Sequence, residues 1–256
     1  MLPIKKSLLA VSLFFMIPLV ARADNPALKS VEIQVENVFV AHDGFDDNDR
    51  IQIVVHGVLW NSCYRTAETV VEPMGDGHTL NVRQFAGVIQ NGICGDQPAS
   101  MPPELGVSVP FNKVVDIGAL RADKYELRFK AGKDKFAFTA LNVVEAKVPT
   151  IDDVPYAAVG SIMIREVVTS TEDIKLTLSG LITSTCTELD QVKVIQEDDV
   201  IIVLPLLKLN ADVACASTME PFVKEVSLGQ LPPREYLVHV RSANGNSVNH
   251  VFRVVK

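Results

Sequence analysis

The sequence lacks the short motifs that mark the common enzyme classes. It contains no H-E-x-x-H metal motif, no P-loop and no G-x-G-x-x-G dinucleotide fingerprint. Residues 106–110 begin like a G-x-S-x-G nucleophile elbow but end in proline, where the elbow requires glycine. The five histidines are scattered, and we expect His56 to be a solvated residue on a sheet rather than a catalytic base. The sequence therefore predicts a protein that is not an enzyme and that needs no cofactor.

Long apolar runs are also lacking, with one exception at the N-terminus. Residues 1–23 carry two lysines, an apolar run at 7–20 and the sequence Ala21-Arg22-Ala23, a layout typical of a cleavable secretory signal. An uncleaved membrane anchor is the alternative, but such a helix needs roughly 20 apolar residues. We therefore expect an exported chain, periplasmic, extracellular or on the cell surface, with no integral membrane insertion after the signal is removed.

Basic residues are too few for a polyanionic partner. The chain has 24 lysines and arginines against 31 aspartates and glutamates, which gives a formal net charge of −7. The signal segment holds three of the basic residues and no acidic one, so its removal makes the net charge −10. Because proteins bind nucleic acids largely through lysine and arginine contacts to phosphate, this balance argues against a nucleic-acid partner.

Cysteine is scarce, and the four cysteines show no C-x-x-C or C-x-x-H spacing. Four cysteines in an exported chain are expected to form two disulfides. An internal repeat favours pairing Cys63 with Cys94 and Cys186 with Cys215, at nearly equal separations. A zinc site that uses all four is the alternative, but no ligand spacing supports it.

Helical periodicity is absent, whereas alternation of apolar and polar residues is common. Residues 51–63 alternate up to Gly57 and end at Cys63, and residues 174–186 do the same with Gly180 and Cys186. Such alternation predicts a half-buried β-strand. Other segments recur in the same order, so the sequence predicts an all-β protein made of two copies of one unit.

The repeat sets the expected domain boundaries. About 233 residues remain after signal removal, enough for two domains of roughly 100 to 150 residues. After the signal at 1–23 we expect a first β-sandwich at 28–145, a linker with two prolines at 146–155 and a second β-sandwich at 156–256. Each copy contains about seven short strands, and Asn244-Gly245 predicts a tight hairpin turn in the second.

Two features of each copy resemble the immunoglobulin-like sandwiches of bacterial envelope and secreted proteins. One is the G-x-x-x-x-x-C strand end, and the other is L-x-x-x-x-Y, which ends at Tyr125 and Tyr236. The second feature looks like a tyrosine corner, in which the hydroxyl bonds to upstream backbone. The resemblance implies a binding or spacer role. Leucine and valine stand where antibody-type domains carry their second cysteine, so these are expected to be relatives of that fold rather than antibody modules.

An acidic loop precedes the first repeated strand. Its four carboxylates, on Asp43, Asp46, Asp47 and Asp49, could surround a calcium ion. The loop lacks the ordered D-x-D-x-D-G register, however, and the second copy has lost most of the acids. We therefore expect a polar turn and no metal, with these aspartates as weak candidates.

The first copy carries large side chains that the second lacks, so the shared core does not require them. Trp60, Tyr64 and Arg65 align with threonine, threonine and glutamate. A longer loop, residues 95–106 with Pro98 and Met101, should emerge at the same pole of the sandwich. Tryptophan, tyrosine and arginine dominate binding hot spots. These residues predict a surface that binds an unknown protein or surface polymer.

Other interpretations of the same residues stay open. Trp60 could lie over the disulfide as a local cap, and the proline-rich loop could be a spacer. A different hypothesis for the whole chain is a structural spacer or assembly subunit that self-associates through sheet edges. A third is a hydrolase or a protease inhibitor whose active groups lie on loops.

Overall fold

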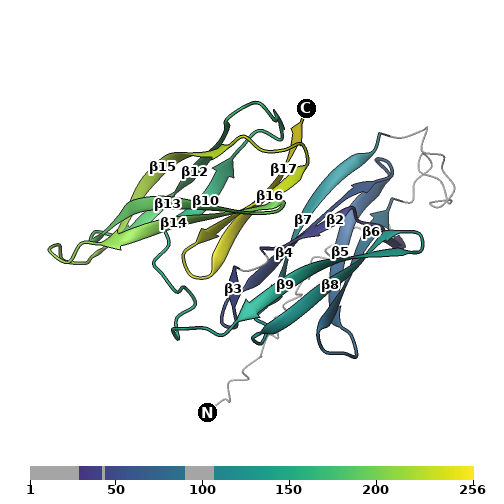
Figure 1. Cartoon of the computed structure of the whole chain (residues 1–256), viewed down its shortest axis with the longest axis horizontal. Coiled ribbons are helices and arrows are strands. Elements are labelled where there is room, and N and C mark those ends of the chain that lie inside the picture. The colour runs from purple at the N-terminus through teal and green to yellow at the C-terminus, as the bar shows by residue number, and fades with distance from the viewer. Residues whose placement is uncertain (1–28, 42–43, 90–106) are drawn as a thin grey trace, which may run out of the picture.

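The computed structural model describes residues 29–41, 44–89 and 107–256, and all of its regular elements in these ranges are β-strands (Figure 1). The strands of the first half are β1 (Lys29–Ile33), β2 (Asn37–Phe39), β3 (Phe45–Asp46), β4 (Ile51–Leu59), β5 (Tyr64–Pro73), β6 (Thr79–Val88), β7 (Val109–Gly118), β8 (Asp123–Gly132) and β9 (Lys135–Val144). Those of the second half are β10 (Ala158–Met163), β11 (Val167–Thr169), β12 (Ile174–Ser184), β13 (Thr187–Glu197), β14 (Val200–Leu209), β15 (Ser217–Gly229), β16 (Glu235–Ser242) and β17 (Asn246–Val255). The predicted all-β class is confirmed.

Apart from β1, which has no counterpart strand in the second half, the two halves share one strand order, which agrees with the repeat in the sequence. In the first half β2-β4-β7 form small sheet 1, and β1-β6-β8-β9-β3, with β5 on β6, form large sheet 1. In the second half β10-β12-β15 form small sheet 2, and β11-β17-β16-β14-β13 form large sheet 2. The parallel pairs recur too, since β6 runs parallel to β8 and β14 runs parallel to β16. We call the two halves the first and the second sandwich.

The repeated glycine has a packing reason in both copies. Gly57 pairs with Phe111 across β4 and β7, and Gly180 pairs with Phe222 across β12 and β15. A Cβ atom on Gly57 would lie 3.0 Å from the Phe111 ring, and one on Gly180 would lie 2.8 Å from the Phe222 ring. Glycine at these positions therefore leaves room for the ring on the neighbouring strand.

Three local predictions are confirmed. The hydroxyl of Tyr125 donates to the Arg121 carbonyl and that of Tyr236 to the Pro232 carbonyl, each at 3.0 Å. The hairpin predicted at Asn244-Gly245 joins β16 and β17 through residues 243–245, and Asn244 and Gly245 have positive φ values of 63° and 68°.

The predicted bond between Cys186 and Cys215 is present and closes a loop of 29 residues. A loop of that length restrains the unfolded chain by about 3.6 kcal/mol on the loop-entropy account. Cys63 is also disulfide-bonded. Its predicted partner, Cys94, lies outside the described residues, so that pairing stays a prediction.

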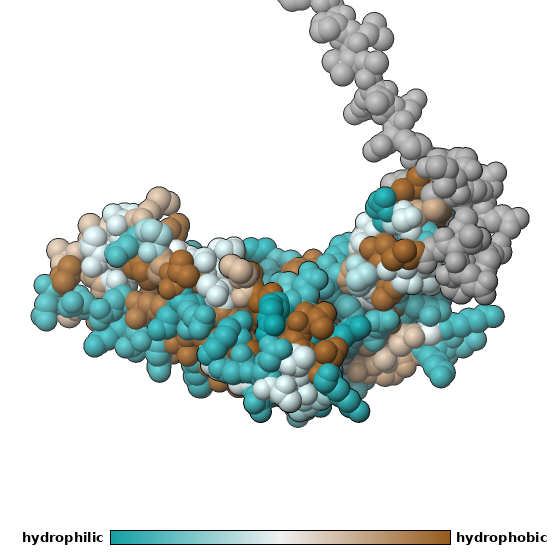
Figure 2. All heavy atoms as spheres, turned by 90° about the horizontal axis from the view of Figure 1, so that it is seen from above, coloured by the Kyte–Doolittle hydropathy of each residue, from teal (hydrophilic) through white to brown (hydrophobic). Residues whose placement is uncertain are grey.

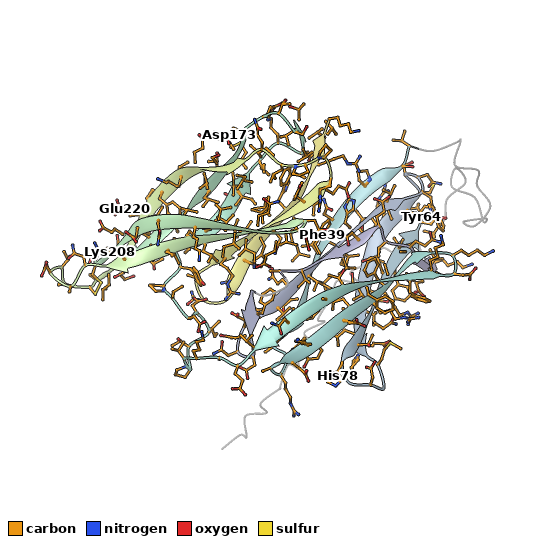
Figure 3. All side chains as sticks on the ribbon, viewed as in Figure 1. Phe39, Tyr64, His78, Asp173, Lys208 and Glu220 are labelled. Carbon is orange, nitrogen blue, oxygen red and sulfur yellow. A yellow bond between two sulfur atoms is a disulfide. The ribbon has the colours of Figure 1, made fainter. Side chains whose placement is uncertain are left out.

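The two sandwiches pack directly against each other. The outer face of small sheet 1 packs against the outer face of large sheet 2, and we call this contact the seam. Val200, Ile202, Leu237 and Val251 of large sheet 2 belong to the buried cluster of the first sandwich. Phe39 of β2 is fully buried and lies between the two halves (Figure 3). The two sandwiches thus form one arched body, hollowed on one side (Figure 2).

The segment between the sandwiches is held on both sides. The Asn48 side chain donates to the carbonyls of Val148 and Thr150 at 3.0 and 3.1 Å. Asp152 accepts hydrogen bonds from the backbone N–H groups of Asn244 and Gly245 at 2.6 and 3.0 Å. These bonds attach the segment to the acidic loop of one sandwich and to the hairpin turn of the other, which favours a fixed relative orientation.

Candidate functional site

The pole predicted to bind a partner begins at the turn after β4. The Asn61 carboxamide oxygen accepts a hydrogen bond from the Cys63 N–H at 2.8 Å, which closes an Asx turn. Arg65 donates to the Ser62 and Tyr64 carbonyls at 2.7 and 2.8 Å, so its guanidinium braces the same turn. Trp60 projects from this turn with 47% of its surface exposed.

Tyr64 is not at the surface, in contrast to the sequence-based hypothesis. Its side chain is buried in the core of the first sandwich, and its ring meets Trp60 edge to face at 5.2 Å. Burial raises the pKa of Tyr64. The buried tyrosine ring therefore packs against the exposed Trp60 ring from the core side. Pro98 and Met101, predicted for the same surface, lie outside the described residues.

The carboxylates of the acidic loop have structural roles. Asp49 accepts a hydrogen bond from the Asp46 N–H at 3.0 Å, and Asp47 accepts one from the Ala146 N–H at 3.0 Å. Burial raises the pKa of Asp46. These bonds brace the turn and the segment between the sandwiches. Asp43, the fourth weak metal candidate, is outside the described residues.

Polar groups line the apolar seam and are matched in pairs across it. Asp49 forms an ion pair with Arg241, and both residues are buried. Gln52 accepts hydrogen bonds from Ser247 and Asn249 at 2.7 and 2.8 Å. Because buried polar groups are costly unless paired, these contacts fix one orientation of the two sandwiches.

His239 lies in the seam as a neutral imidazole. Its Nδ1 is 2.8 Å from the Asn249 carboxamide oxygen, and its ring meets Phe45 edge to face. Burial lowers the pKa of His239 to about 4, the hydrogen bond with Asn249 opposes that change, and the charge on Arg241 adds to it. In an unfolded chain a histidine has a pKa near 6.5.

Acid should therefore weaken the fold through His239. Above about pH 6.5 the group is neutral in both states, and below that value only the unfolded chain gains the proton until the pH approaches 4. We expect this histidine alone to remove about 3 kcal/mol of unfolding free energy between pH 7 and pH 4. Urea titrations at several pH values on the native chain and on His239→Gln would measure it. The variant should lose about 3 kcal/mol less, and parallel profiles would contradict the assignment. His78→Gln, which changes an exposed histidine, should follow the native profile.

A third histidine marks a cluster that sequence reasoning did not identify. His56 was expected to be solvated, but it is only 4% exposed because large sheet 2 covers its face of β4. On β4 it sits between Asn37 of β2 and Asn112 of β7 in one cross-strand row. Its Nδ1 is 2.6 Å from the Asn112 carboxamide oxygen.

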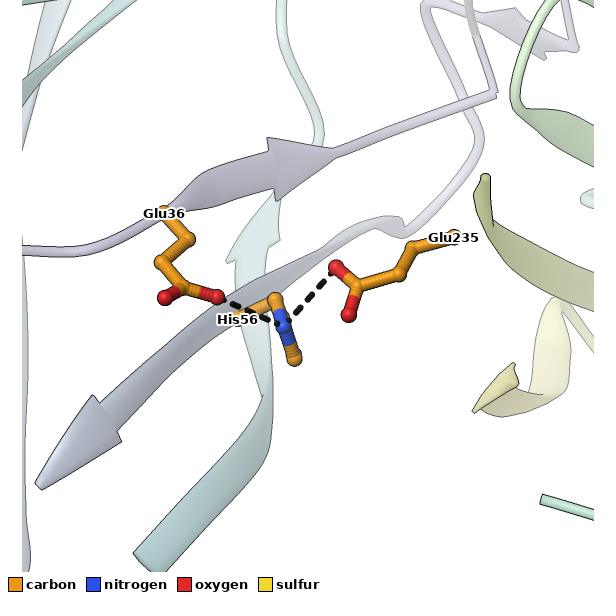
Figure 4. A group of neighbouring side chains, drawn as sticks. All are labelled: Glu36, His56 and Glu235. Carbon is orange, nitrogen blue, oxygen red and sulfur yellow. Dashed lines mark ion pairs between the residues drawn. The ribbon is translucent and has the colours of Figure 1, made fainter. Parts of the chain in front are cut away.

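Two carboxylates face the other nitrogen of His56 from opposite sides of the seam (Figure 4). Its Nε2 is 3.3 Å from Glu36 Oε2 in the first sandwich and 3.0 Å from Glu235 Oε2 in the second. The other oxygen of Glu235 accepts a hydrogen bond from Arg253 Nε at 3.0 Å. The three donor atoms lie within 4.8 Å of one another. We call these residues the His56 cluster (Glu36, His56 and Glu235).

His56 and Glu235 of the cluster line a pocket of about 300 Å³, together with residues of β7 and β17. Asn112, His250 and Arg253 line the same pocket. Within the described part of the chain, neither His56 Nε2 nor His250 Nε2 has a hydrogen-bond partner, although both are buried. The contacts of His56 with its carboxylates are close, but no acceptor is aligned with the ring nitrogen. The lining of the pocket therefore includes two histidines and the carboxylate-bearing Glu235.

One signal in the sequence could have revealed the seam. Residues 200–207 read Val-Ile-Ile-Val-Leu-Pro-Leu-Leu, and residues 236–240 read Tyr-Leu-Val-His-Val, without alternation. Continuous apolar runs are typical of strands that are covered on both faces. A histidine inside such a run is a covered histidine, as His239 proves to be.

The strand order and the buried clusters define an all-β protein with β-sandwich architecture. A family model described as ORF11 beta-sandwich domain matches residues 176–254, which form most of the second sandwich. The match covers about a third of the chain, so the likeness concerns that sandwich. No curated protein and no solved structure matched the chain. In the described ranges, no helix has the length and apolar composition needed to cross a membrane.

Proposed function

We propose that this chain is an exported, non-catalytic binding protein of two tandem immunoglobulin-like domains. It captures a protein or surface polymer through the pole of the first sandwich that carries Trp60. The observation that carries the proposal is the group of exposed apolar side chains at this pole, Trp60, Val107 and Val109. Single exposed apolar residues are common, but a group at one pole of a rigid sandwich is a typical recognition surface.

Comparison of the two copies supports this interpretation. Leu59 pairs with Val109 at the end of β4 and β7, and the equivalent pair in the second sandwich is Ile182 with Glu220. Trp60 is likewise replaced by Thr183. Leu59 keeps an apolar equivalent in Ile182, whereas the exposed Trp60 and Val109 are replaced by threonine and glutamate. The apolar pole is therefore a property of the first sandwich and is not required by the fold.

Two further observations support export and the immunoglobulin-like assignment. The disulfide between Cys186 and Cys215 suits an oxidising compartment, as does the signal-like layout of residues 1–23. The tyrosine hydroxyl bonds of Tyr125 and Tyr236 are the corner contact of such sandwiches.

The test separates recognition from stability. We expect Trp60→Ala to weaken capture at least tenfold, because a tryptophan at the centre of a contact often contributes about 2 kcal/mol or more. The melting temperature should stay within about 2 °C, because half of the side chain is already in solvent. Capture would be quantified with the purified chain as bait on envelope and culture-medium fractions, beside a thermal melt of the same sample.

Two matched variants complete that experiment. Thr183→Ala changes the equivalent position of the second sandwich and should leave both capture and stability unchanged. Tyr64→Ala removes a buried ring, so it should lower stability by about 3 kcal/mol or more. Unaltered capture by Trp60→Ala would refute the proposed pole.

A second candidate function is a spacer or assembly subunit, which is favoured by long edge strands. Among the described strands, β13 pairs only with β14, and it runs from Thr187 to Glu197. An unpaired edge of that length can add a strand from another chain. The carboxylates on β13, such as Glu188 and Asp190, oppose this pairing by charge repulsion. Self-association that rises with concentration and persists in Trp60→Ala would favour this candidate over the first.

A further inference from the structure

We infer that the His56 cluster is a binding site for one divalent first-row transition cation, with Zn²⁺ the best fit. The ligands would be Nε2 of His56 and one carboxylate oxygen each from Glu36 and Glu235. This inference does not depend on the proposed pole at Trp60, which lies on another part of the first sandwich.

The hydrogen bond on the far side of the imidazole sets the state of the ligand nitrogen. The Asn112 carboxamide oxygen only accepts, so Nδ1 of His56 must carry the proton in the 2.6 Å contact between them. In the neutral ring Nε2 then holds a lone pair. Metal-binding histidines are commonly fixed this way, with the second nitrogen donating to an oxygen.

The surroundings of Nε2 fit a cation better than a proton. A proton on Nε2 would leave a buried donor with no aligned acceptor among the described residues. Nitrogen and oxygen ligands lie about 2.0 to 2.2 Å from zinc, which puts neighbouring ligands in a tetrahedral site roughly 3.3 Å apart. The separations from Nε2 to Glu36 and Glu235 are 3.3 and 3.0 Å, and the two carboxylate oxygens lie within 4.8 Å of each other, a distance that a small movement of the half-exposed Glu36 side chain can close. The pocket beside the cluster leaves room for a water molecule as the fourth ligand.

The charges and the type of donor also select the cation. Two carboxylates face one neutral imidazole, and Arg253 offsets only one of those charges. An imidazole ligand suits zinc and its neighbours, whereas calcium takes six to eight oxygen ligands. The cluster has no counterpart in the second copy, where Ser179 and Val223 replace His56 and Asn112. The fold itself therefore does not require these residues.

A cation here would join the two sandwiches. Glu36 and His56 belong to the first sandwich, and Glu235 is the first residue of β16 in the second. A ligand that binds only the folded arrangement stabilises it by mass action. Zinc should therefore raise the melting temperature of the chain as well as bind it.

The test uses the untagged full chain after chelation and dialysis. Calorimetric titration with Zn²⁺ should show one site per chain with a micromolar dissociation constant, and Co²⁺ should give a visible absorption band that Zn²⁺ abolishes. Ca²⁺ at a hundredfold excess should not compete. Glu36→Gln should weaken Zn²⁺ binding at least tenfold, and its melting temperature without metal should stay near the native value because Glu36 is half exposed.

Two further variants make the outcome decisive. His78→Gln changes an exposed histidine that contacts a single carboxylate, Asp123, and should leave Zn²⁺ binding unaltered. Glu235→Gln should weaken binding as Glu36→Gln does while it keeps the hydrogen bond from Arg253. The absence of stoichiometric binding, or binding at full strength in both glutamine variants of the cluster, would overturn the inference.

Discussion

Leu237→Glu is expected to separate the two sandwiches while each keeps its own fold. Leu237 is fully buried in the seam, and its equivalent in the first sandwich is Glu126, which is exposed. The two positions match in detail, because the Leu237 N–H donates to the Asp199 carbonyl and the Glu126 N–H donates to the His78 carbonyl. The substitution therefore puts the residue of one copy into the backbone setting of the other.

The expected cost is roughly 4 kcal/mol, because a carboxylate without a partner cannot stay buried in an apolar seam. The seam will open once this cost exceeds the free energy with which the two sandwiches dock. The loss of stability therefore cannot exceed that docking free energy. Small-angle scattering should show a larger radius of gyration. Denaturation should change from one transition to two, since the sandwiches no longer share a buried cluster.

The reciprocal variant, Glu126→Leu, is the control. It places leucine on an exposed face of large sheet 1, so stability should change by less than about 0.5 kcal/mol. Equal effects of the two substitutions, or an unchanged radius of gyration in Leu237→Glu, would show that the seam does not hold the sandwiches together.

The sequence predicts local structure well because alternation, glycine and tyrosine positions report short-range constraints. The glycine recurs, as Gly57 and Gly180, because a phenylalanine ring lies against it in each copy. The tyrosine recurs because its hydroxyl donates a hydrogen bond to the backbone carbonyl four residues earlier in each copy. Such constraints act within one copy, so comparing the copies reveals them. The cysteine pairing between Cys186 and Cys215 follows from the same comparison.

The seam was not predicted, because it depends on what differs between the copies. Val200 and Ile202 of β14 align with Thr79 and Asn81 of β6, so one large sheet has an apolar outer face and the other a polar one. The shared alternation of the two copies marks their common strands, but it carries no signal for a face that only one copy covers. For the same reason His56 was expected in solvent: on an isolated sandwich its face of β4 would be exposed.

The sites could be predicted only in part. The sequence identifies Trp60 because threonine stands at the equivalent position of the second copy. The structure shows that the Trp60 side chain is exposed. Tyr64 shares that contrast but points into the core, which alternation does not reveal across a turn. The His56 cluster joins residues almost 200 positions apart on two sandwiches, and no spacing rule connects them.

The second large effect is expected at Arg241, whose guanidinium pairs with Asp49 across the seam. The exposed fractions are 6% for Arg241 and 3% for Asp49, so water cannot replace either partner. Arg241→Met should lower the unfolding free energy by about 3 to 5 kcal/mol, because it leaves the buried Asp49 carboxylate without its counter-ion. Urea denaturation at pH 7 would measure the loss. Lys130→Met also replaces a basic residue with methionine, at the equivalent position of the first sandwich. It should lower the unfolding free energy by less than about 1 kcal/mol because Lys130 is partly in solvent.

The double variant Arg241→Met with Asp49→Asn distinguishes a stabilising ion pair from one that selects an orientation. Replacing both members of a buried pair can be nearly neutral, because the desolvation cost of both charges is removed together with their attraction. We therefore expect the double variant to recover about 2 kcal/mol or more of the loss. Its radius of gyration should match the native value, since the apolar contacts of Ile202, Leu237 and Val251 remain. If the double variant were as unstable as Arg241→Met, the attraction between the two charges, and not the unpaired carboxylate, would be the source of the effect.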